Sequence, residues 1–128
     1  MTPRQPFQYA ALQIVPRVER GEAVNAGVVL FCRPLRFLGA RTYLDDALLA
    51  ALSPGCDPDA VRPLLTTVEK IAAGDVSGGP IARLQPSERF HWLVAPASTI
   101  VQPGPVHTGL TSDPPHELDR LFAKLAAR

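Results

Sequence analysis

The sequence lacks the residue patterns that would assign it to a known catalytic or metal-binding class. Its 128 residues include two cysteines, one tryptophan and 6% aromatic residues. Cys32 and Cys56 show neither a C-x-x-C motif nor metal-ligand spacing, so we expect no metal and no cofactor. A G-x-S-x-G motif and a glycine-rich phosphate-binding loop are also missing. No complete catalytic motif remains, and the sequence leaves open whether the protein is an enzyme.

The chain also has no excess charge of one sign. Thirteen Lys and Arg residues face twelve Asp and Glu residues, which gives a formal net charge of +1. This balance supplies no overall attraction to nucleic acid or anionic lipid, and the low aromatic content provides few surfaces for base stacking. Nucleic-acid binding is therefore disfavoured. A local basic patch is conceivable in the first third of the chain, although arginines there more often lie on the solvated face of a sheet: Arg17, Arg20, Arg33, Arg36 and Arg41.

Long apolar runs are absent as well. The first six residues, Met-Thr-Pro-Arg-Gln-Pro, lack the apolar core of a signal peptide, and the longest apolar stretch is too short to cross a bilayer. We expect a cytoplasmic protein that does not enter a membrane. An apolar fraction of 46% and a charged fraction of 20% are ordinary for a globular chain, and the length predicts one domain over residues 1–128.

The first third of the chain predicts a β-sheet. Residues 7–15 and 24–33 are apolar runs separated by a charged, glycine-containing connection, which indicates a long antiparallel hairpin, and residues 35–43 add a third strand. Gly27 inside the second strand predicts a bulge or a close approach by another group, and Gly39 is a candidate bulge in the third strand.

The rest of the chain predicts helices and two short strands. Capping residues indicate helices over 45–52, 57–74 and 87–95 and from Asp113 to the C-terminal end, with Pro63 a candidate kink or start of the second helix. The apolar stripe of that helix is Val61, Leu64, Leu65, Val68 and Ile71. Residues 98–102 and 106–110 read as strands joined by a tight Pro-Gly-Pro turn. The fold class is therefore α+β, with a mainly antiparallel sheet from the N-terminal hairpin and third strand, packed by three to four helices.

Polar residues that could carry chemistry occur in two regions. Arg20, Glu22 and Asn25 surround the hairpin connection, where Asn25 could equally close the loop onto its own backbone. His107 lies in an irregular Pro/Gly stretch where it could act as an acid or base, or serve only as a structural hydrogen-bonding group. Glu22 and Arg89 could join an acid–base or anion-binding set with His107, or form a salt bridge between the two regions.

Three segments resemble those of a family of small bacterial proteins, domain of unknown function (DUF) 3037. They are residues 20–32 (RGEAVNAGVVLFC), 87–98 (SERFHWLVAPAS) and 100–110 (IVQPGPVHTGL). The resemblance extends from Tyr9 to the final helix and implies no reaction. It does imply a partner role, because members are often encoded beside a HipA-like kinase protein. The residues that carry it are Glu22, Asn25, Gly27, Arg89, Trp92, Ser98, Gln102, His107 and Gly109.

Two readings of function follow. The first is an accessory or regulatory protein that acts through protein–protein contact, with a HipA-like kinase or as a homodimer, and that exposes an apolar patch. The second is an enzyme or anionic-ligand-binding domain with a polar pocket formed by Glu22, Asn25, Arg89, Gln102 and His107. The candidate ligand or partner site common to both readings is Arg20, Glu22, Asn25, Arg89, Ser98, Gln102 and His107.

Overall fold

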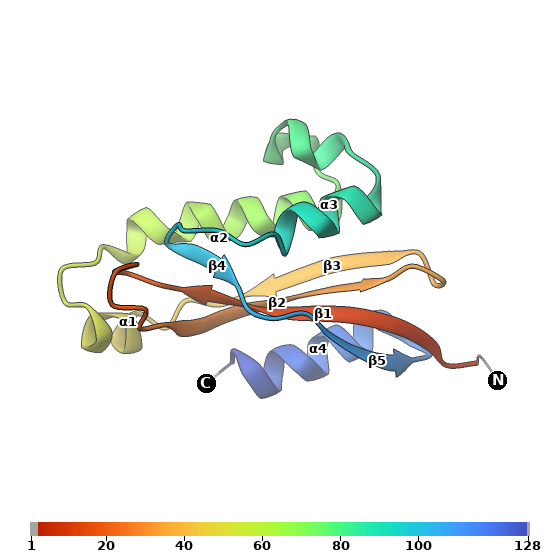
Figure 1. The fold of residues 1–128 in the computed structure, drawn as a ribbon, viewed down its shortest axis with the longest axis horizontal. Coiled ribbons are helices and arrows are strands. Elements are labelled where there is room, and N and C mark those ends of the chain that lie inside the picture. The colour runs from red at the N-terminus through yellow and green to blue at the C-terminus, as the bar shows by residue number, and fades with distance from the viewer. Residues whose placement is uncertain (1–2, 128) are drawn as a thin grey trace.

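A five-stranded antiparallel sheet lies between two helical layers in the computed structural model, which describes residues 3–127 (Figure 1). Helices α2 and α3 lie on one side of the sheet, and α4 lies on the other. The elements, in chain order, are β1 (Gln5–Ile14), β2 (Val24–Cys32), β3 (Phe37–Thr42), α1 (Asp46–Leu52), α2 (Pro58–Ala73), the 3₁₀ turns η1 (Val76–Gly78) and η2 (Pro80–Arg83), α3 (Pro86–Leu93), β4 (Val101–Pro103), β5 (His107–Thr111) and α4 (Pro114–Leu125). The predicted α+β class is confirmed.

Strand β1 is the centre of the sheet. It pairs with β2 along one side, and β2 pairs with β3, which gives the predicted hairpin and third strand. On its other side β1 pairs with two short strands, β4 near its C-terminal end and β5 near its N-terminal end. All of these pairings are antiparallel, so the later part of the chain runs back along the whole length of β1.

The predicted tight turn between the two short strands is wrong. Both β4 and β5 pair with β1, and Gly104 N donates to Ala11 O at 2.8 Å between them, so the chain continues along β1 without reversing. The step in register between the two pairings accommodates one extra residue, as in a β-bulge. Pro103 and Pro105 are tolerated because this segment is an edge, where a missing N–H breaks no ladder bond.

The two strand glycines have different roles. The β1–β2 register shifts opposite Gly27, and a Cβ there would lie 2.6 Å from the backbone O of Arg41, so both the bulge and the close approach are confirmed. Gly39 does not form a bulge, because the β2–β3 register is regular throughout. It makes room for a neighbouring ring instead, since a Cβ there would lie 2.7 Å from Cζ of Phe37.

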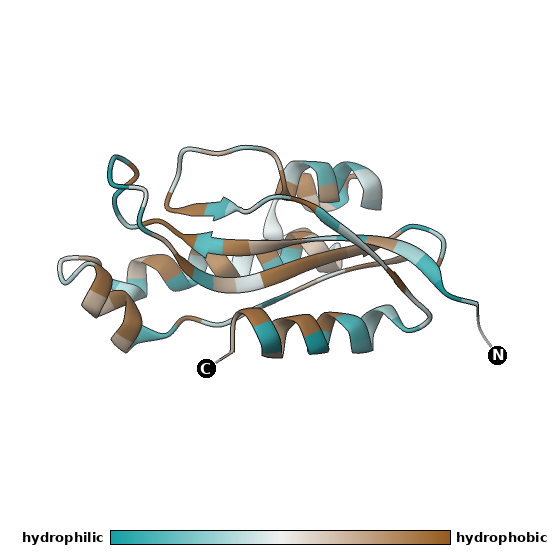
Figure 2. Ribbon diagram, turned by 60° about the horizontal axis from the view of Figure 1, so that its bottom comes forward, coloured by the Kyte–Doolittle hydropathy of each residue, from teal (hydrophilic) through white to brown (hydrophobic). Residues whose placement is uncertain are grey.

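Alternation along β2 supplies the core on both faces of the sheet. Val29 and Phe31 pack with α2 and α3, whereas Val28 and Leu30 pack with α4. Because both faces are covered, β2 is nearly all apolar and buried, and its ribbon is largely brown in Figure 2. Helix α4 instead alternates between brown and teal, as expected for a helix with one buried face.

The predicted ends of α2 match the structure closely, whereas α3 runs from Pro86 to Leu93 with Gln85, not Ser87, as its N-cap. Asp57 caps α2 by accepting from Asp59 N, and Gly74 ends it in a left-handed conformation with φ of +74°. The helix begins at Pro58 and runs through Pro63 as one element, so it does not start near Arg62. Within residues 3–127, every helix is too short or too polar to traverse a bilayer.

Candidate functional site

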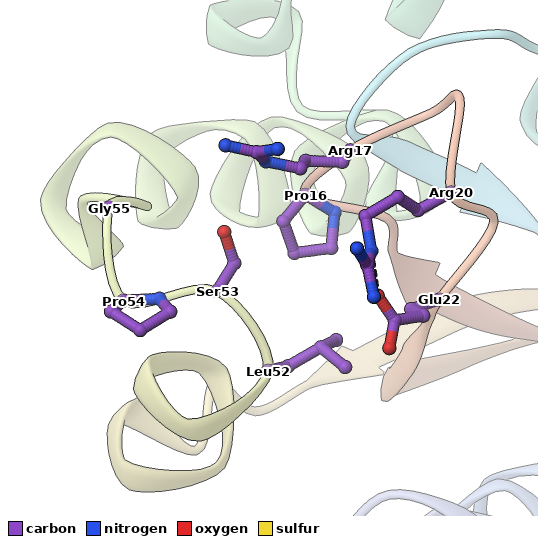
Figure 3. A pocket seen from close by; sticks show the side chains of 8 residues that line it. All are labelled: Pro16, Arg17, Arg20, Glu22, Leu52, Ser53, Pro54 and Gly55. Atoms are coloured by element: carbon purple, nitrogen blue, oxygen red, sulfur yellow. Dashed lines mark hydrogen bonds and ion pairs between the residues drawn. The ribbon is translucent and has the colours of Figure 1, made fainter.

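The polar residues singled out in the sequence lie in several separate places. Arg20 and Glu22 are paired on the exposed loop between β1 and β2 (Figure 3). The Arg20 guanidinium donates to Oε1 of Glu22, and this hydrogen bond together with the opposite charge lowers the pKa of that carboxyl. The pair lies beside a hollow of about 280 Å³, which is also lined by Arg17 and by the turn after α1 at Ser53.

Asn25 joins the sheet to the end of α4. Its Nδ2 donates to Leu125 O at 3.2 Å, and its Oδ1 accepts from Nε2 of Gln13 at 3.3 Å. Asn25 does not close the loop onto its own backbone, because its partners are a neighbouring strand and a helix a hundred residues away. Its amide therefore satisfies a backbone group that the C-terminal turn of α4 would otherwise leave unpaired.

Arg89 joins α3 to the C-terminal end of α2. Its Nη1 donates to Ile71 O at 2.9 Å and to Ala72 O at 2.8 Å, and its Nε donates to Leu84 O at 3.0 Å. A cation at a helix C-terminus also interacts favourably with the helix dipole. The predicted salt bridge between Arg89 and Glu22 is wrong, because each side chain has a different partner.

The remaining candidates are Ser98, Gln102 and His107. Gln102 and His107 lie on β4 and β5, which pair with β1, and Ser98 precedes β4. Ser98 lies exposed in the connection before β4, and Nε2 of Gln102 donates to Thr99 O at 2.8 Å. His107 lies opposite Tyr9 with the two ring centroids 5.3 Å apart. From Tyr9 to Ile14, at the end of β1, is about 17 Å at about 3.4 Å per residue, so His107 lies far from the hairpin loop.

These positions do not support a single polar pocket. Arg20 is beside Glu22, and Gln13 lies opposite both Asn25 and Gln102 in the sheet, so those groups are close. Arg89 and His107 are elsewhere, and neither lines the hollow beside Glu22. The acid–base set proposed for Glu22, Arg89 and His107 therefore lacks the convergence that such chemistry requires.

A different site, which the sequence did not indicate, lies between α2 and the connection from α3 to β4. It is a groove of about 470 Å³ whose lining is almost entirely apolar. Trp92 and Leu64 stand at the groove with 50% and 44% of their surfaces exposed. The full lining is Leu12, Leu64, Thr67, Val68, Ile71, Trp92, Leu93, Ala95, Pro96, Ala97, Thr99, Val101 and Pro103.

The groove arises from the way three segments meet. Leu64, Val68 and Ile71 recur at helical spacing along the side of α2 that faces the connection. Helix α3 ends at Leu93, and the chain then crosses beside α2 through Pro96 to enter β4. The prolines and alanines of this connection are short side chains, so they leave space beside α2.

The groove offers apolar surface and few reactive groups. None of its lining side chains is ionisable, so it offers no acid, base or nucleophile of the usual kinds. Its two hydroxyls are already engaged, since Oγ1 of Thr67 donates to Pro63 O and Oγ1 of Thr99 donates to Val101 O. An apolar group placed here would gain mainly by leaving water.

The sequence held two signals for this site, although neither was sufficient. Leu64 belongs to the apolar stripe of α2 but is exposed, so the stripe is wider than the buried face. Trp92 is the only tryptophan of the sequence and lies in a segment that resembles the family, but the segment alone does not indicate that its ring is exposed.

The fold and the groove together define a small α+β domain with one antiparallel sheet, helices on both faces and an apolar groove. The chain belongs to the family described as "Protein of unknown function (DUF3037)", whose pattern matches residues 9–126. No curated protein and no solved structure matches the chain.

Proposed function

We propose that this protein is a small accessory protein that acts by binding a partner protein through the groove between α2 and the α3–β4 connection. The observation that carries the proposal is the pair of exposed side chains, Trp92 and Leu64, beside an apolar hollow of about 470 Å³. Tryptophan is enriched among the residues that dominate binding energy at protein interfaces.

The form of the groove favours a protein segment over a small molecule. Small-molecule sites bury most of the ligand and usually place a few polar groups to orient it. This groove leaves half of Trp92 in water, and its two hydroxyls already donate to backbone oxygens. An uncharged, apolar segment of a partner protein is the occupant that such a surface fits, because it needs no polar partner at its centre.

The first partner to test is a HipA-like kinase, which the family resemblance implies.

Titration calorimetry of the purified protein with a purified HipA-like kinase tests the proposal. Leu64→Ser and Trp92→Ser each remove an apolar side chain from the groove, and we expect each to weaken binding by about tenfold or more. Val76→Ser is the matched control, because Val76 is an exposed apolar residue on η1 outside the groove. Absence of binding at about 100 μM kinase, or equal binding by all four proteins, would overturn the proposal.

A further inference from the structure

Strand β5 forms part of one outer edge of the sheet. Ala11 O accepts from Gly104 N and Val15 N donates to Ile100 O, so the odd-numbered residues of β1 direct their backbone groups toward β4 and β5. In β5, His107 and Gly109 lie opposite odd-numbered residues of β1 and therefore face it. The N–H and C=O groups of Thr108, which lies between them, point away from the sheet, as do those of Leu110.

Individual positions elsewhere on the sheet edges are blocked. Pro103 and Pro105 bring no N–H to the edge beside β5. On the opposite edge, the outward N–H of Thr42 donates to Oε1 of Glu69 on α2 at 2.9 Å. Such devices keep exposed strands from pairing with other chains. In β5 the outward Leu110 O has only Arg4 Nη2 at 3.5 Å, a long and solvent-exposed contact that a strand N–H could replace.

The β5 edge also carries exposed apolar side chains and no lysine or carboxylate. Leu110 is 52% exposed and Val106, just before the strand, is 41% exposed. Side chains at alternate positions share one face, so Val106, Thr108 and Leu110 form a short row along the edge. A partly apolar edge, on which Arg4 makes one long contact and the backbone groups of Thr108 face outward, is a template for a further strand.

We infer that this edge binds a second copy of the chain, with two β5 strands pairing antiparallel about a two-fold axis at Thr108. In that register Thr108 lies opposite itself, and Val106 of each copy lies opposite Leu110 of the other, which forms two apolar cross-strand pairs. His107 then lies opposite Gly109, so the ring meets no side chain. The edge is thus complementary to itself in hydrogen bonding and in its apolar cross-strand pairs.

The dimer involves a different surface from the groove that is proposed to bind a partner. Leu64 and Trp92 lie on helices, and the groove reaches the sheet edge only at β4. An interface of one short strand is small, so we expect association at the weak end of specific contacts, with a mass that rises with concentration. Leu64→Ser should leave this association unchanged.

Disulfide cross-linking tests both the dimer and its register. Directly opposed residues in a hydrogen-bonded antiparallel pair have Cα atoms about 5.5 Å apart, within reach of a disulfide. In a Cys56→Ser background, Thr108→Cys should therefore form a covalent dimer under mild oxidation. Leu110→Cys should not, because its two copies are offset by four residues along the strands, or about 13 Å. Cys32 is fully buried and does not interfere.

Sedimentation velocity provides the second readout. The mass should rise from 13.8 kDa toward twice that value as concentration increases. Thr108→Pro removes an outward N–H and leaves the β1 ladder intact, so it should weaken dimerisation by about tenfold, since each dimer loses two hydrogen bonds. A chain that stays monomeric at about 500 μM would overturn the inference. So would cross-linking of Leu110→Cys as efficient as that of Thr108→Cys.

Discussion

Replacing Arg89 by alanine should destabilise the fold strongly although the side chain lies outside the proposed binding surfaces. Three backbone oxygens, those of Ile71, Ala72 and Leu84, accept from its guanidinium. Ile71 O also accepts from Gly74 N, so it keeps one partner after truncation. The substitution therefore leaves backbone oxygens at the C-terminal end of α2 with fewer hydrogen-bond donors. It also removes a positive charge from the negative end of the helix dipole.

The expected cost is about 2–3 kcal/mol, which is less than three full charged hydrogen bonds because water reaches part of the site. Unfolding entropy is about 2.1 cal/mol/K per residue, so 128 residues give about 0.27 kcal/mol/K. The melting temperature should then fall by about 7–11 °C. Differential scanning calorimetry measures this fall, and urea unfolding gives the free energy independently.

Two comparisons make the Arg89 measurement decisive. Arg83→Ala removes the same charge from an exposed position on η2, and it should change the free energy of unfolding by less than about 0.5 kcal/mol. Arg89→Lys keeps the charge but not the planar fork that spans two segments, so its loss should be intermediate. If Arg89→Ala costs no more than the Arg83 control, the assignment of Arg89 to the end of α2 is refuted.

Two further predictions concern the sheet and the hairpin loop. Gly27→Ala places a Cβ 2.6 Å from the backbone O of Arg41, so it should cost about 2 kcal/mol or more in urea unfolding, and a loss below about 0.5 kcal/mol would contradict the close packing. Glu22 should titrate below its ordinary pKa in carbon-detected NMR, because its hydrogen bond with Arg20 favours the charged form. The pKa of Glu22 is lower in the folded protein than in the unfolded chain. The stabilising contribution of its contact with Arg20 is therefore fully present above the pKa of the unfolded chain, and it is lost as the pH falls through the pKa of the folded protein. Arg20→Ala should raise the Glu22 pKa, and an unchanged value would exclude the pairing.

Local signals predicted the elements of the fold well, because those signals act over a few residues. Asp57 and Gly74 bound α2 through a side-chain cap and a left-handed residue, and both can be recognised in the sequence. The prediction of a tight turn at Pro103–Pro105 was wrong because the conformation there depends on a distant part of the chain. The composition of this segment is typical of a turn, but its conformation follows from pairing with β1, which is about ninety residues earlier in the chain.

The positions of Arg89 and Asn25 could not be predicted, because each side chain binds backbone groups far away in the sequence. Arg89 binds the oxygens of Ile71 and Ala72, and Asn25 binds the oxygen of Leu125, so the side-chain identities of those partners carry no signal. A polar residue used in this way looks the same in sequence as one used in chemistry. The groove was missed because Leu64 has the spacing of a core residue, and only the path of the α3–β4 connection leaves it exposed.

The arrangement of the layers explains why both proposed surfaces lie on the same side of the molecule. Helices α2 and α4 pack mainly on β2 and β3, so the β4–β5 side of the sheet has less helical cover. Apolar residues on that side, such as Val101 in the groove and Leu110 on the edge, therefore remain partly exposed. A partner of matching shape would remove this apolar surface from water, which is favourable. On the β3 side, α2 and α4 already cover the corresponding apolar surface. A charged residue introduced at Leu110 should thus disturb association and leave folding nearly unchanged.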